Sequence, residues 1–117
     1  MINNVSNIEF NTKSFTQNRP DYRKICDGNR VAACILYYLQ VLEDRRLRDG
    51  HPLQQPHTET IGGLVGICDG YSRRTVCDAL AVLLAKGYLV KTSGVGQKLR
   101  LIFKTDLVQK CVYSIKS

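Results

Sequence analysis

The most informative segment of the chain is Ser72-Arg73-Arg74-Thr75-Val76-Cys77-Asp78-Ala79-Leu80, followed by Leu83 and by Lys86-Gly87-Tyr88-Leu89. Ser72 is a favourable N-cap because its hydroxyl can accept a hydrogen bond from a backbone N–H of the first helical turn. The apolar positions from Val76 to Leu83 recur at helical spacing and predict one buried stripe. Gly87 can adopt the left-handed conformation that commonly ends a helix. We therefore expect a helix over Tyr71 to Ala85, with Arg73, Arg74 and Cys77 on the face opposite the stripe.

A β-hairpin is expected directly after this helix. Tyr88 to Thr92 predicts one strand, Ser93 to Gln97 a turn, and Lys98 to Lys104 the returning strand. Apolar and largely basic residues alternate along the second strand, so one face should be apolar and the other basic. Residues Asp106 to Val112 predict a last short helix or a strand, and the pattern does not decide between them.

Two further helices are expected before the central segment. The first begins after the N-cap Asn29, carries apolar residues at spacings of three and four, and ends by Gly50. Its end carries Arg45, Arg46 and Arg48 beside two acids, and we expect a solvated helix end there, with a second DNA-binding patch as the alternative. The second helix is expected over Glu59 to Val65, capped by Thr58. The segment His51 to His57 predicts a polar loop in which neither histidine needs a special role.

The chain is 117 residues long, the usual size of a single domain. Its start is polar and rich in asparagine, and Arg19-Pro20 is expected to exclude helix at that point. We therefore divide the chain into an N-terminal arm, residues 1–24, and one domain, residues 25–117.

The expected order of helices followed by a hairpin resembles that of winged helix-turn-helix DNA-binding proteins. The resemblance rests on serine, arginine, any residue, threonine and valine in Ser72 to Val76, then Ala79, Leu80 and Leu83, with Gly87 before the first wing strand. The segment Gly28 to Ala33 with Leu36-Tyr37-Tyr38-Leu39 resembles the first helix of winged-helix proteins from phages and plasmids. The resemblance implies an α+β, mainly α fold with a three-helix core and a β-hairpin wing.

The resemblance also implies roles by position. Ser72 would cap the recognition helix and touch a phosphate, and Arg73 would read a base, most naturally guanine, or clamp a phosphate. Arg74 and Thr75 would contact the backbone or a base edge. Cys77 stands where a long polar or basic side chain is common in the family, so its base readout is expected to be narrow. The basic wing residues, which would contact DNA, are Lys91, Lys98 and Arg100.

Charge supports a nucleic-acid partner. The chain carries 17 basic and 10 acidic residues, a formal net charge of +7. From Lys86 to Ser117 there are seven basic residues and one acid, so most of the excess lies in the proposed wing and the C-terminal segment. Basic proteins favour anionic partners, of which nucleic acid is the commonest. Solvated surface charge and protection of an edge strand are the alternative explanations for these cations.

Double-stranded DNA is thus the expected partner, bound by a homodimer that pairs through the long first helix, the N-terminal arm or both. Transcriptional regulation and the replication or maintenance of a mobile genetic element are the expected roles. The competing interpretation is a protein-interaction module, favoured by Ala81, Val82 and Leu84, which make the second half of the central helix apolar nearly all round.

Other function classes receive no support from the sequence. None of the five cysteines forms a C-x-x-C pair, and both histidines lie far from them in sequence, so no metal site is expected. We expect buried, reduced thiols and a cytoplasmic location. The longest apolar run, Val31 to Leu39, is too short to span a bilayer. No paired carboxylates, activated nucleophile or phosphate-binding glycine loop is present, so we expect no enzyme activity, no cofactor and no small-molecule substrate.

Overall fold

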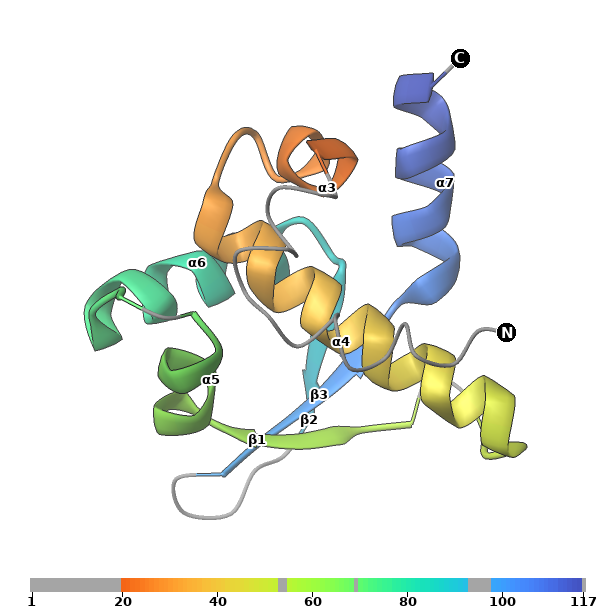
Figure 1. The fold of residues 1–117 in the computed structure, drawn as a ribbon, viewed down its shortest axis with the longest axis horizontal. Coiled ribbons are helices and arrows are strands. Elements are labelled where there is room, and N and C mark those ends of the chain that lie inside the picture. The colour runs from red at the N-terminus through yellow and green to blue at the C-terminus, as the bar shows by residue number, and fades with distance from the viewer. Residues whose placement is uncertain (1–19, 53–54, 69, 93–97, 117) are drawn as a thin grey trace.

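The computed structural model describes residues 20–52, 55–68, 70–92 and 98–116. These residues form an α+β structure that is mainly helical, as predicted, with a small antiparallel sheet (Figure 1). The elements in chain order are α3 (Pro20–Ile25), α4 (Arg30–Asp49), β1 (His57–Thr60), α5 (Ile61–Ile67), α6 (Arg73–Ala85), β2 (Leu89–Thr92), β3 (Lys98–Phe103) and α7 (Thr105–Lys116).

Helix α4 is the central element against which the other helices and the sheet pack. Its predicted caps are confirmed: Asn29 Oδ1 accepts from the N–H of Ala32 at 2.9 Å, and Gly50 closes the helix with φ +77°. Its N-terminal half is buried nearly all round because α3, α5, α6 and β3 all contact it. A helix enclosed in this way sets the positions of the elements around it.

The sheet has the strand order β1-β3-β2, with both pairs antiparallel. The hairpin β2–β3 was predicted, but β1 was not. The predicted helix over Glu59 to Val65 was wrong at its start, because His57–Thr60 pair with Leu101–Lys98 of β3. The cap is therefore Thr60 and not Thr58: the Thr60 hydroxyl accepts from the N–H of Gly63 at 2.9 Å, and the helix runs Ile61–Ile67.

The expectation that Arg19-Pro20 excludes helix was also wrong. Helix α3 begins at Pro20. Proline has no backbone N–H, but the first N–H groups of any helix lack an intrahelical partner, and the fixed φ of proline suits a helix. Tyr22 and Ile25 are buried, and the Tyr22 ring meets the Tyr37 ring edge to face with centroids 5.4 Å apart. Helix α3 spans the boundary drawn between arm and domain, and the rest of the arm lies outside the described residues.

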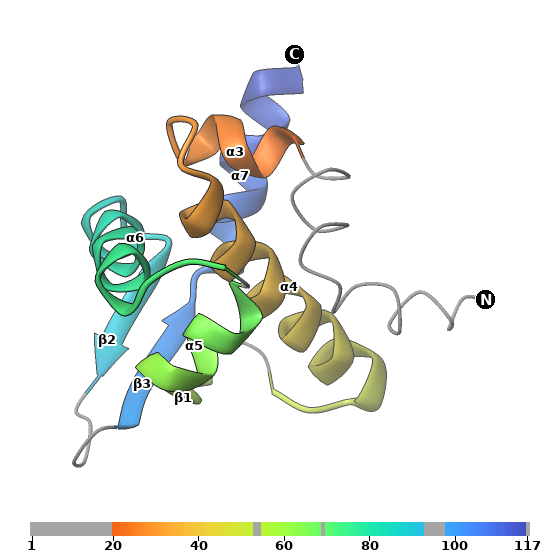
Figure 2. The same cartoon turned by 60° about the vertical axis from the view of Figure 1, so that its left-hand side comes forward.

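The C-terminal segment is helical, which resolves the choice left open by its sequence. Helix α7 buries Val108 and Val112 and lies beside α3, as Figures 1 and 2 show. No helix in the described part of the chain is both long and apolar enough to cross a membrane.

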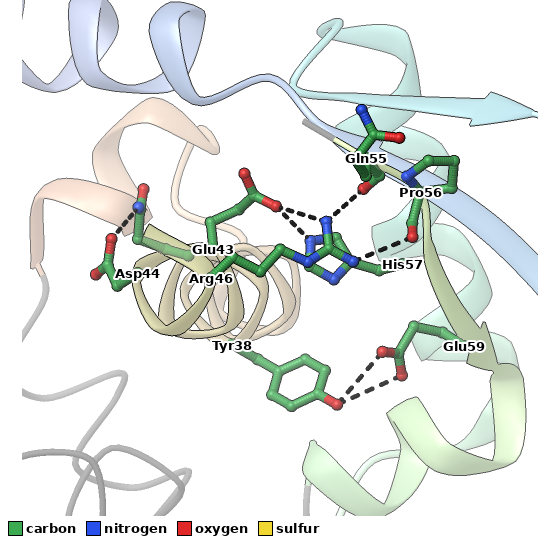
Figure 3. Close-up of polar contacts among 9 residues, drawn as sticks. Tyr38, Glu43, Asp44, Arg46, Gln55, Pro56, His57 and Glu59 are labelled. Carbon is green, nitrogen blue, oxygen red and sulfur yellow. Dashed lines mark hydrogen bonds and ion pairs between the residues drawn. The ribbon is translucent and has the colours of Figure 1, made fainter. Parts of the chain in front are cut away.

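A buried polar cluster joins the end of α4 to β1 (Figure 3). Glu43 Oε1 lies 2.7 Å from Nε2 of His57 and accepts from Nη1 of Arg46 at 3.1 Å, and Arg46 also donates to the backbone oxygens of Gln55 and Pro56. Glu43 is 2% exposed and His57 5%. Burial lowers the pKa of His57 below its ordinary value. The expected polar loop was therefore wrong at His57, because that residue belongs to β1 and lies against Glu43. The expected solvated helix end was wrong at Arg46, whereas Arg48 is exposed as expected.

The C-terminal end of α6 is fixed by contacts with the turn between α3 and α4. Lys86 Nζ lies 2.7 Å from Asp27 Oδ2, and the Tyr88 hydroxyl donates to the Ile25 carbonyl oxygen at 2.9 Å. Gly87, with φ +80°, ends the helix as predicted. These contacts hold α6 at a defined position on the helical core.

The cysteines are free, and their burial differs. Cys26, Cys34 and Cys68 are buried as expected, whereas Cys77 is exposed and Cys111 half-buried. Desolvation raises the pKa of the Cys26 thiol to about 12. Cys77 projects from the outer face of α6, as its predicted place opposite the apolar stripe implies.

Candidate nucleic-acid interface

Helices α5 and α6 form a packed pair joined by residues 68–72 (Figure 2). Gly70 takes φ +87° in this connection, which lets the chain reverse before α6. Ser72 caps α6, as predicted: its hydroxyl accepts from the N–H of Thr75 at 3.2 Å. The Ser72 and Thr75 hydroxyls also lie 2.9 Å apart and share a hydrogen bond. The two side chains therefore order the first turn while remaining exposed.

The exposed face of α6 carries the three residues that were expected there. Arg73, Arg74 and Cys77 are all exposed. The predicted stripe on the other side is buried and comprises Val76, Ala79, Leu80 and Leu83. No acidic residue stands in the first turn of α6. The arginines lie where the helix dipole is positive and mildly unfavourable to them, so an anion bound at this end of the helix would be stabilising.

The second half of α6 is only partly covered by the described residues. Val82 and Leu84 are half-buried, and Ala81 and Ala85 are exposed. The elements that pack on α6 are α4, α5 and β2, and they reach its inner side. Part of the apolar outer side therefore stays open to a partner.

The hairpin distributes its three cations over two faces of the sheet. Directly paired residues of an antiparallel sheet project from the same face. Arg100 pairs with Thr58 on one side and Thr92 on the other, and Lys98 pairs with Thr60. Lys91 instead pairs with the fully buried Leu101, so it projects from the face that packs on the helices.

The cations expected to contact DNA have no internal partner among the described residues. Ion pairs there use other cations, as in Lys86 with Asp27 and Arg46 with Glu43. The unpaired and exposed set is Arg73, Arg74, Lys91, Lys98 and Arg100. Folding thus leaves five positive charges on α6 and the hairpin available to an external anion.

Other exposed residues near these cations were not expected from the sequence. Thr58 and Thr60 lie on the same sheet face as Arg100 and Lys98, and Tyr71 is exposed beside the start of α6. The alternation of β-branched threonines in His57-Thr58-Glu59-Thr60 was the signal for a strand, but it covers only four residues. Tyr71 carried no signal beyond its place in the turn.

The described residues hold no cluster of three or more histidine, cysteine, aspartate or glutamate side chains that could bind a metal ion. Comparison of the chain with family models, curated proteins and solved structures finds no match. A function is therefore inferred from the residues and their arrangement.

Proposed function

We propose that this chain is a winged helix-turn-helix protein that binds double-stranded DNA with sequence selectivity. In this proposal α5 and α6 are the helix-turn-helix pair, α6 is the recognition helix, and β2–β3 is the wing. The element order α4-β1-α5-α6-β2-β3, with one antiparallel sheet, is compatible with that fold. The biological role would be transcriptional regulation, or replication or maintenance of a mobile genetic element.

The observation that carries the proposal is the exposed arginine pair at the start of α6. Arg73 and Arg74 have no acidic neighbour in the first turn and no ion pair among the described residues. Two cations at a helix N-terminus destabilise the helix by about 0.3–1 kcal/mol each unless an anion binds there. A phosphate would reverse that cost, because backbone N–H groups and guanidinium groups would then bind it together.

The dimensions of α6 suit the major groove. Its 13 residues span roughly 20 Å at about 1.5 Å per residue. The major groove of B-DNA is about 12 Å wide and accepts one helix, whose N-terminal residues reach base edges. Arg73 would then read a guanine or bind a phosphate, with Arg74 and Thr75 on the backbone or a base edge. Lys91, Lys98 and Arg100 would bind phosphates beside the helix.

A direct binding measurement tests the proposal. Fluorescence anisotropy of a labelled duplex of about 24 bp, titrated with the protein at about 50 mM salt, should show saturable binding that an excess of one sequence competes better than others. Replacement of Arg73 and Arg74 by alanine should weaken this binding and remove the preference for one sequence. Absence of binding by the wild type at this salt concentration would refute the proposal.

A protein-interaction module is the second candidate, and the open apolar side of α6 favours it. Ala81 is exposed and Val82 half-buried, whereas DNA-reading helices usually carry polar residues there. Such a module would keep its partner when Arg73 and Arg74 are replaced and would lose it on Val82→Glu. A homodimer that uses this side is the simplest form of the alternative, and sedimentation of wild type and Val82→Glu measures it.

A further inference from the structure

Two buried thiols lie side by side where helix α4 contacts the end of α5. Cys34 belongs to the N-terminal half of α4, and Cys68 caps the C-terminus of α5. Cys34 is 3% exposed and Cys68 1%. The Cys34 sulfur lies 3.8 Å from the carbonyl oxygen of Ile67, within reach of an S–H hydrogen bond. Because this oxygen belongs to the peptide group that leads into Cys68, the two cysteines meet at one point of the contact between the helices.

The two side chains also form a hydrogen bond with each other, in which the Cys34 thiol is the donor. This donation raises the pKa of Cys34, and burial raises it further. The same hydrogen bond lowers the pKa of Cys68, against the opposite effect of burial. Cys68 is therefore the member of the pair that gives up its proton more readily, and the thiolate is the nucleophilic form of cysteine.

The backbone of Cys68 lies directly beneath an exposed turn. Its carbonyl oxygen accepts from the N–H of Tyr71 at 3.1 Å, and both Gly70 and Tyr71 are exposed. Enclosure of the sulfur slows attack on Cys68 relative to the exposed Cys77. It also keeps external thiols away from an oxidised Cys68, so that the neighbouring Cys34 is the group placed to react with it.

We propose that Cys34 and Cys68 form a modification site at which a hydroperoxide produces an intramolecular disulfide. The Cys68 thiolate attacks one oxygen of hydrogen peroxide, the O–O bond breaks and hydroxide leaves, so that the sulfur becomes a sulfenic acid. The Cys34 sulfur then attacks the Cys68 sulfur, the S–O bond breaks, and water leaves with the proton of the Cys34 thiol. The sulfurs are oxidised, the peroxide is reduced to water, and no other reactant is needed.

The disulfide would tie α4 to the connection that leads into α6. Cys68 begins that connection, and Ser72, the cap of α6, ends it. Oxidation would therefore fix to the helical core the point from which α6 is presented. The disulfide is detected without DNA, so the inference stands or fails independently of the proposed function.

Peptide mapping of the full chain tests this proposal, because each of the five cysteines lies in a different tryptic peptide. The reduced protein is treated with hydrogen peroxide, the excess is destroyed with catalase, and remaining thiols are alkylated before digestion without reductant. We expect residues 31–45 linked to residues 49–73, in a yield at least about tenfold above that of any other pair within one chain. The same treatment in urea should remove this preference, because the two cysteines are then no longer neighbours.

Variants separate this site from unspecific oxidation. In Cys34→Ala the Cys68 sulfenic acid lacks its partner, so dimedone should label Cys68, with folding checked by far-UV circular dichroism. Cys77→Ser removes an exposed thiol outside the site and is the matched control, which should leave the yield of the disulfide unchanged. The proposal would be overturned by absence of the link in the folded wild type, by comparable yields of several pairs, or by loss of the link in Cys77→Ser. A folded Cys34→Ala variant without dimedone label on Cys68 would overturn it as well, and the wild-type map decides if that variant unfolds.

Discussion

Replacing Arg73 and Arg74 by alanine should change how steeply DNA binding depends on salt. Each phosphate that a cation neutralises contributes about −0.9 to the slope of log K against log salt concentration. Five unpaired cations lie on α6 and the hairpin, so the wild type should show a slope of about −4.5. Between about 50 and 200 mM salt, this corresponds to an affinity loss of roughly 500-fold. The double variant retains three of these cations, so its slope should be about −2.7 and its loss roughly 40-fold.

Fluorescence anisotropy on one mixed-sequence duplex at four salt concentrations measures both slopes. The control is Arg23→Ala with Lys24→Ala, which removes the same charge from exposed positions in the last turn of α3. This control should leave the slope close to that of the wild type. Equal slopes for wild type and the Arg73 and Arg74 variant, or an equal reduction in the control, would refute the placement of α6 on DNA. Both arginine side chains are exposed, so the double variant should stay folded. Removing two cations from the helix N-terminus should raise the free energy of unfolding by about 0.6–2 kcal/mol.

Three further predictions concern the folded protein itself. Ser72→Ala removes the cap of α6 and should lower the free energy of unfolding in urea by about 1 kcal/mol, whereas Ser72→Asp should keep most of it; equal stability of both variants to wild type would contradict the cap. A thiol-alkylating reagent should modify exposed Cys77 first, as mass spectrometry can follow. Buried Cys26, whose pKa is raised to about 12, should react only on unfolding. Early alkylation of Cys26 would show that its site opens in the folded protein. Because burial lowers the pKa of His57 in the folded state, the unfolded chain binds the proton more strongly, so stability should fall as pH drops below 6.5. His57→Gln should lack the part of this pH dependence that comes from His57. If the difference in free energy of unfolding between wild type and His57→Gln stays constant between about pH 5 and 7, His57 does not contribute to the pH dependence.

The sequence predicted best those elements whose ends are set by local chemistry. Asn29, Ser72 and Gly87 cap or end their helices as expected, because each acts through its own backbone or the next turn. Strand β1 could not be predicted in this way, since four polar residues become a strand only by pairing with β3 far along the chain. The same pairing buries His57 against Glu43, so that polar cluster was missed as well.

In the candidate site, too, the features set by local sequence were predicted, and those set by strand pairing were not. The exposure of Arg73 and Arg74 follows from helical periodicity within one segment and was predicted. The separation of Lys91 from Lys98 and Arg100 was not, because it depends on which residues of β2 and β3 pair. A strand pattern states which residues alternate, whereas only the register states which cations share a face.

That separation bears on how the hairpin could read DNA. A ribbon with positive charge on both faces gains most from phosphates on both sides of it, and the minor groove, about 6 Å wide, offers two such walls close together. Entered edge-on, the groove would be sensed through its width, which depends on base sequence even where no side chain touches a base. Affinity would then rise when an A-tract replaces mixed sequence under the hairpin, and part of the selectivity of this protein would lie in the shape of the double helix.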